Sequence, residues 1–69
     1  MKSNLLAFSL EVSRMSWEAA AMAWQDAAAA YADNDEHYAS AMRKRAEKMV
    51  EMAKDADRHV MVLKDREAE

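Results

Sequence analysis

The sequence contains no cysteine, no glycine and no proline among its 69 residues. Without cysteine the chain cannot form disulfide bonds, which support many very small domains. Without glycine and proline it lacks the residues that build most tight turns, β-hairpins and phosphate-binding loops. Aromatic residues make up only 7% of the chain. These absences exclude a disulfide scaffold and predict an all-α protein.

Long apolar runs are also lacking. A transmembrane helix needs about 18 consecutive residues that are predominantly apolar, and Glu18 and Asp26 interrupt the alanine-rich segment. The apolar run near the N-terminus ends at Leu10 and is followed by Glu11, which is not typical of a secretory signal. We therefore expect no membrane partner and a cytoplasmic location, in the host cytoplasm if the protein is viral.

Alanine at 16 positions and methionine at seven dominate a chain that is 52% hydrophobic. A chain this short buries only about 60% of the surface that its unfolded form exposes, so its own core is marginal. A metal or a second chain is then the usual support. Neither His37 nor His59 lies in the Glu-x-x-His motif of bundle-type metal sites. We expect no metal or other cofactor, and hence a partner chain.

The only mid-chain cluster of helix-unfavourable residues is Asp33-Asn34-Asp35. Asp33 followed by Glu36 fits a capping box that begins a second helix, whereas Asn34 could adopt the left-handed conformation that ends the first helix. A short connection favours an antiparallel two-helix hairpin; one continuous helix is the alternative. The prediction is a single domain over 1–69, with helices over about 3–32 and 35–66 and a turn over about 33–35.

The second predicted helix has one apolar stripe. Its members alternate at intervals of four and three residues, which is the heptad pattern of helices that pack side by side. The other positions carry charges of both signs, as on a solvated surface. We expect this stripe to face the first helix. It comprises Met42, Ala46, Met49, Ala53, Ala56, Val60 and Leu63.

The first predicted helix has two apolar stripes, separated by a lane of small residues. A helix that is apolar on most of its circumference belongs among several neighbours. One partner helix covers one stripe only, so the other stays uncovered in an isolated hairpin. One stripe comprises Leu6, Leu10, Trp17, Trp24 and Tyr31; the other comprises Leu5, Phe8, Val12, Met15, Ala19, Met22, Ala23 and Ala30; the lane comprises Ser9, Ser16, Ala20 and Ala27.

The uncovered stripe predicts that the hairpin is not a monomer. Two hairpins that meet through their first helices would bury both stripes in a dimeric four-helix bundle, and two-fold symmetry is the commonest arrangement. Large aromatic residues are also typical of interface hot spots. The predicted protein interface comprises Leu6, Leu10, Trp17, Trp24 and Tyr31, together with Phe8 and Met61 near the open end of the hairpin.

No arrangement of residues points to catalysis. The serines lie in helical sequence with no histidine placed to activate them, and a two-helix hairpin offers its carboxylates no evident pocket for acid–base chemistry. We therefore expect a small acidic homodimer that is not an enzyme. It would act stoichiometrically as an inhibitor or adaptor of another protein, in the manner of small proteins encoded by viruses and mobile elements.

A basic cluster early in the second predicted helix supports an alternative, a small nucleic-acid-binding regulator. Arg43, Lys44, Arg45 and Lys48 could contact phosphates. Against this, Glu47 lies within the cluster and no aromatic residues interleave for base stacking. The net charge of −3 also argues against nucleic acid as the main partner.

Overall fold

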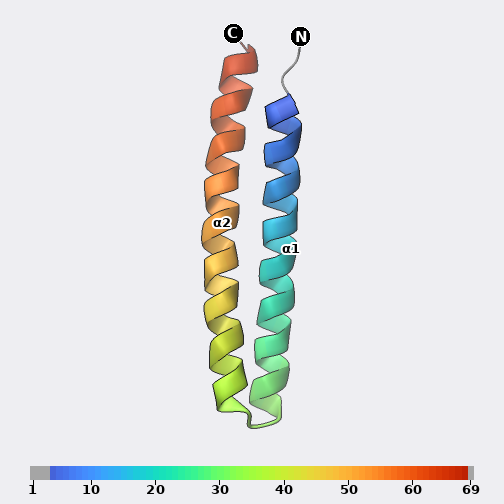
Figure 1. Cartoon of the computed structure of the whole chain (residues 1–69), viewed down its shortest axis with the longest axis vertical. Helices are drawn as coiled ribbons and strands as arrows, with labels where there is room; N and C mark the ends of the chain where they lie inside the picture. The colour runs from blue at the N-terminus through green and yellow to red at the C-terminus, as the bar shows by residue number, and fades with distance from the viewer. Residues whose placement is uncertain (1–3, 69) are drawn as a thin grey trace.

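Two long α-helices lie side by side and antiparallel in the computed structural model of the chain (Figure 1). The model describes the backbone of residues 4–68 and the side chains of residues 4–66. Helix α1 spans Asn4–Ala32 and helix α2 spans Glu36–Ala68; the predicted start at residue 3 lies outside the described residues. The all-α class and the hairpin are confirmed, and the continuous helix is excluded.

The turn ends α1 with a residue in the left-handed conformation. Asn34 has a φ of 60°, a region that asparagine tolerates better than most residues. Its backbone N–H donates to the carbonyl of Tyr31 at 3.0 Å, and the N–H of Asp35 donates to the carbonyl of Ala30 at 2.8 Å. These two hydrogen bonds form a Schellman motif, which satisfies carbonyls that a helix end leaves without partners.

Asp35 both closes this motif and begins α2. Its carboxylate oxygen Oδ1 accepts a hydrogen bond from the backbone N–H of Tyr38 at 3.0 Å, which is the bond that defines an N-cap. The capping box predicted from Asp33 is therefore wrong, and the left-handed Asn34 is confirmed. The reason is that Asn34 reverses the chain after Asp33, so that Asp35 is the residue that directly precedes α2.

Small side chains make the contact between the two helices. Buried residues recur along each helix at intervals of three, four or seven, the repeat of helices that pack lengthwise. Among the described side chains none larger than valine is buried. We call this contact the alanine seam; it comprises Ser16, Ala20, Ala23, Ala27 and Ala30 of α1 and Ala39, Ala46, Ala53, Ala56 and Val60 of α2.

The apolar stripe predicted on α2 does face α1. Its alanines and Val60 are buried, and Met42, Met49 and Leu63 are half-buried. Ala39, which is fully buried and lies seven residues before Ala46, was missing from the predicted stripe. The seam therefore extends to within a few residues of the turn.

The orientation of α1 differs from the prediction. Helix α2 covers the lane of small residues, which includes Ser16 and Ala20, and not one of the two large apolar stripes. Ala23 and Ala30, which had been assigned to a stripe, belong to the seam. The physical reason is size, because a large side chain facing fully buried Ala46 or Ala53 would hold the helices apart. Both stripes consequently flank the seam, one on each broad side of the hairpin.

Candidate protein interface

Both broad sides of the hairpin expose large apolar side chains of α1. Ser16 and Ala23 are buried in the seam, and each follows a methionine and precedes a tryptophan. Because successive residues differ by 100° around a helix, these methionines and tryptophans lie on opposite sides. The aromatic face carries Leu10, Trp17, Trp24 and Tyr31, and the methionine face carries Leu5, Phe8, Met15 and Met22; their exposed fractions range from 41% for Trp17 to 65% for Phe8 and Met22.

On the aromatic face, Asp57 of α2 holds Trp17 in place. The indole Nε1–H of Trp17 donates to Oδ2 of Asp57 at 3.0 Å, and the hydroxyl of Ser13 donates to Oδ1. Both donors belong to α1, so one carboxylate links the two helices. The hydrogen bond from Ser13 and then that from Trp17 lower the pKa of Asp57 from its ordinary value.

The aromatic face continues from Trp17 toward the turn as a strip without charge. Trp24 and Tyr31 follow at intervals of seven residues. Exposed Ala21 lies four residues after Trp17 and three before Trp24, and exposed Ala28 has the same relation to Trp24 and Tyr31. Residues three and four apart are neighbours on a helix surface. Large aromatic side chains therefore alternate with alanines along this strip.

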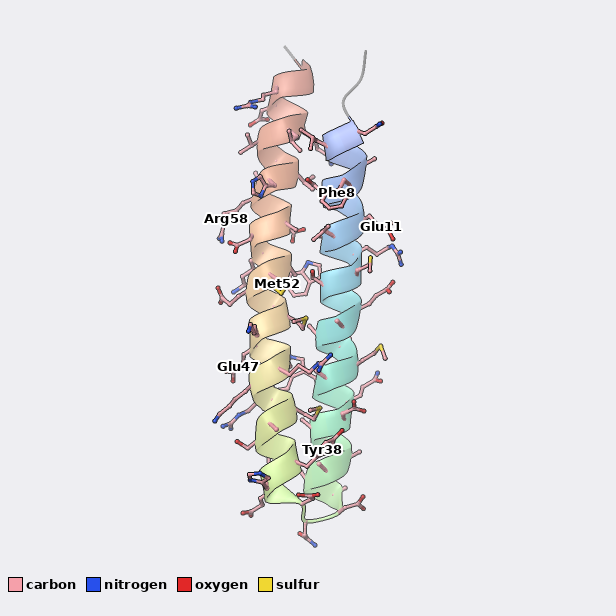
Figure 2. All side chains as sticks on the ribbon, in the orientation of Figure 1. Phe8, Glu11, Tyr38, Glu47, Met52 and Arg58 are labelled. Carbon is pink, nitrogen blue, oxygen red and sulfur yellow. The ribbon has the colours of Figure 1, made fainter. Side chains whose placement is uncertain are left out.

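The methionine face is hollowed by two grooves, and its side chains differ in chemistry from those of the aromatic face. Phe8, Met52 and Tyr38 are distributed along the hairpin from its open end to the turn (Figure 2). Methionine side chains are flexible and adapt to different surfaces, and charged groups border both grooves. One groove, of about 590 Å³, is lined by residues that include Leu5, Phe8, Val12, His59, Val62 and Arg66; the other, of about 270 Å³, is lined by residues that include Met22, Asp26, Tyr38, Met42 and Arg45.

Charged side chains occupy the outer edges of the hairpin. Glu11 projects from the outer edge of α1, and Glu47 and Arg58 project from that of α2 (Figure 2). Arg14 forms ion pairs with Glu11 and with Glu18, the latter at 2.8 Å. These pairs are exposed and contribute little to stability. The edges are thus suited to water, in contrast to the two broad faces.

The basic cluster is distributed around α2. Arg43, Lys44, Arg45 and Lys48 are all exposed, but Arg43 lies 3.9 Å from Glu47. Arg45 borders the groove near the turn on the methionine face. Consecutive helical residues point in different directions, so Lys48 lies near Lys44 and Arg45, four and three residues before it, whereas Arg43 lies on another side of the helix.

The predicted interface residues do not form one surface. Phe8 lies on the methionine face, whereas the predicted residues of the aromatic stripe lie on the other side of the seam. Leu6 is half-buried, and Met61 of α2 is 67% exposed. Sequence reasoning did not include in the predicted interface Ser13, Asp57, Met15, Met22, Tyr38 and Met52.

In the part of the chain that the structure describes, no group of three or more histidine, aspartate or glutamate residues is placed to hold a metal ion. Neither α1 nor α2, over the described residues, is long and apolar enough to cross a membrane.

Comparison with known proteins gives no relative from which a function could be inferred. No family model matches the chain. No curated protein and no solved structure matches it either. The functional argument therefore rests on the two faces of the hairpin.

Proposed function

We propose that this chain is a non-enzymatic protein-interaction module, a helical hairpin that forms a homodimer and acts stoichiometrically as an inhibitor or adaptor of another protein. One observation carries the proposal. The hairpin buries small side chains between its helices and exposes its large apolar side chains on both broad faces. Extended apolar surfaces of this kind are typical of interaction sites.

The total surface supports the homodimer. The chain has an accessible surface of 5458 Å², whereas a folded monomer of its mass is expected to expose about 4,400 Å². The surplus of roughly 1,000 Å² is comparable with the ~800 Å² per partner that a standard protein–protein interface buries. One interface with a second chain would therefore give this chain the exposed surface of an ordinary folded protein.

The stability expected from burial of apolar side chains also supports a homodimer. A seam of alanines buries little apolar area, whereas a large apolar side chain transferred from water into an interface contributes roughly 1.5–3 kcal/mol. Burial of three or four such side chains would contribute an amount comparable with the whole stability of a small domain, which starts at about 5 kcal/mol. A second copy, present wherever the chain is made, can supply this burial.

Two apolar faces provide for two partners. If a second copy covers one face, the other stays available to a different protein, as an inhibitor or adaptor requires. The methionine face suits that role because its flexible side chains adapt and its charged residues, Asp26 and Arg45 among them, can select a complementary surface.

Sedimentation equilibrium from nanomolar to high micromolar concentration tests the homodimer. We expect a species of twice the 7.9 kDa chain mass that dissociates on dilution, with loss of helical circular dichroism as the dimer dissociates. A folded monomer throughout this concentration range would contradict the homodimer.

Affinity capture with a matched pair of variants tests the second partner. A target of the methionine face should be retained by the tagged wild-type protein and by Lys44→Glu, which changes a solvated position, and lost from Met22→Glu. If Met22→Glu captures the same proteins as the wild type, the methionine face does not bind a target.

A further inference from the structure

The aromatic face contains a large side chain that the hairpin itself holds in place. The hydrogen bond of 3.0 Å between Trp17 and Asp57 fixes the indole before any partner binds. Tryptophan and tyrosine have two side-chain torsions and lose little conformational entropy in an interface, whereas methionine has three. A surface that is already ordered binds one fixed shape with the smallest entropic cost.

The spacing on the aromatic face also makes it complementary to itself. Leu10, Trp17, Trp24 and Tyr31 are equally spaced, so the row has the same spacing when it is read in the reverse direction. A two-fold axis near Ala21 would set Trp17 of one copy opposite Trp24 of the other and Leu10 opposite Tyr31. The alanines between the aromatic residues leave room for the side chains of the second copy to interdigitate.

The distribution of charge also favours the aromatic face as the contact between two copies. Between Trp17 and Tyr31 the α1 residues of the aromatic strip carry no charge, and the carboxylate of Asp57 beside Trp17 already accepts hydrogen bonds from Ser13 and Trp17. The grooves of the methionine face are bordered by Asp26, Arg45 and Arg66. Burial of such groups against a second copy would desolvate them, whereas a foreign protein can present complementary charges.

We propose that a second copy of this chain covers the aromatic face, with α1 packed against α1 of the other copy, and that the methionine face stays open in the dimer. The assignment rests on the proposed homodimer. In this arrangement Asp57 is a positioning residue of the interface. It belongs to α2, outside the contact between the two α1 helices, and its carboxylate orients Trp17, which lies in that contact.

Glutamate at exposed alanines provides the test. Ala21 and Ala28 lie on the aromatic face, and Ala29, seven residues after Met22, lies on the methionine face; all three are exposed in the hairpin. Glutamate is a good helix former, so the hairpin can accommodate each substitution. We expect Ala21→Glu and Ala28→Glu to raise the dimer dissociation constant about tenfold or more, because each buries an unpaired charge, and Ala29→Glu to leave it unchanged.

Sedimentation equilibrium measures the dissociation constant, and circular dichroism at high micromolar concentration, where the dimer is populated, verifies the helical content of each variant. Dissociation by Ala29→Glu and not by Ala28→Glu would overturn the assignment of the face while the homodimer stands. A wild-type monomer would instead refute the proposed homodimer itself. Acrylamide quenching of the wild-type protein is a second measurement: tryptophan quenching should decrease as the dimer forms, and unchanged quenching would overturn the assignment.

Discussion

The inner and outer surfaces of α1 are built from opposite kinds of side chain. Toward α2 the helix presents Ser16, Ala20 and Ala23, which are buried, and on its two flanks it presents tryptophan, methionine and phenylalanine, which are exposed. In most globular proteins the large apolar residues are inside. The reversal brings the two helices close together and leaves the large apolar residues exposed, which supports the proposed contacts with other chains.

The outer surfaces of the two helices differ as well. Beyond the seam α1 carries mostly apolar residues, with a charged strip around Glu11, Arg14 and Glu18 and with Asp26 beside a groove. Helix α2 carries charges of both signs along most of its outer surface. An α-helix with so little polar surface is expected inside an assembly. In the proposed homodimer, this comparison would place α1 at the centre and α2 at the periphery.

The largest expected effect comes from a large residue in the seam. Ala46 is fully buried, and Ala46→Leu should lower the free energy of unfolding by about 1–3 kcal/mol because the helices must move apart. The control Ala41→Leu changes an exposed position of the same helix and should change the free energy of unfolding by about 0.5 kcal/mol or less. Urea unfolding at one fixed protein concentration measures both; equal effects would mean that the seam does not determine the packing.

A somewhat smaller effect is expected at the turn. Asn34 has a φ of 60°, and a residue with a β-carbon other than asparagine or aspartate adopts this region at a cost of about 1–2 kcal/mol. Asn34→Ala should destabilise the hairpin by about 1–2 kcal/mol in thermal unfolding, whereas Asn34→Gly should retain or increase its stability. Equal melting temperatures for the two variants would contradict the left-handed turn.

The two aspartates beside Asn34 give a matched pair. Only the carboxylate of Asp35 accepts the hydrogen bond from the N–H of Tyr38, so Asp35→Ala should lower the free energy of unfolding by about 1 kcal/mol. Asp33→Ala should have a clearly smaller effect. Chemical denaturation distinguishes them, and a larger loss at Asp33 would restore the capping box predicted from the sequence.

The smallest effect is the pH dependence of the contact between Trp17 and α2. Because hydrogen bonds from Ser13 and Trp17 lower the pKa of Asp57, this carboxylate stabilises the fold above its ordinary pKa, and the contribution is lost as the pH falls through the lowered pKa. In Trp24→Phe, fluorescence reports Trp17 alone. We expect an emission change with a midpoint below pH 3.8, absent when Asp57→Asn is added; a midpoint above that value would contradict the bond.

The fold was predictable because α2 has one unambiguous stripe and the mid-chain cluster around Asn34 is the only break between helices over residues 4–68. The orientation of α1 was not. Hydrophobicity alone predicts that tryptophan, rather than alanine, faces the other helix. The small size of the facing residues on α2 is what favours alanine there. The recurrence of alanine at positions 39, 46 and 53 was the available signal, since a row of small residues on one helix accommodates a row of small residues on the other.

The two faces were only partly predictable. The aromatic stripe stands out through its seven-residue spacing. The link between Ser13, Trp17 and Asp57 could not be predicted from the sequence. Asp57 lies among many charged residues of α2, and its partners Trp17 and Ser13 are 40 and 44 residues away. Which residues meet across an antiparallel pair depends on the register of the hairpin, and the register follows from the conformation of the turn.

The short turn around Asn34 decides whether the seam forms within one molecule or between two. Because the alanines at positions 39, 46 and 53 recur every seven residues, these three do not by themselves fix which of them meets a given residue of α1, or whether that residue belongs to the same chain. A chain whose turn opened would continue α1 into α2 as one long helix, and two such chains could form the same alanine contacts by exchanging halves. The free energy of this one turn, with Asn34 in the left-handed conformation, therefore sets the balance between the hairpin and the exchanged form.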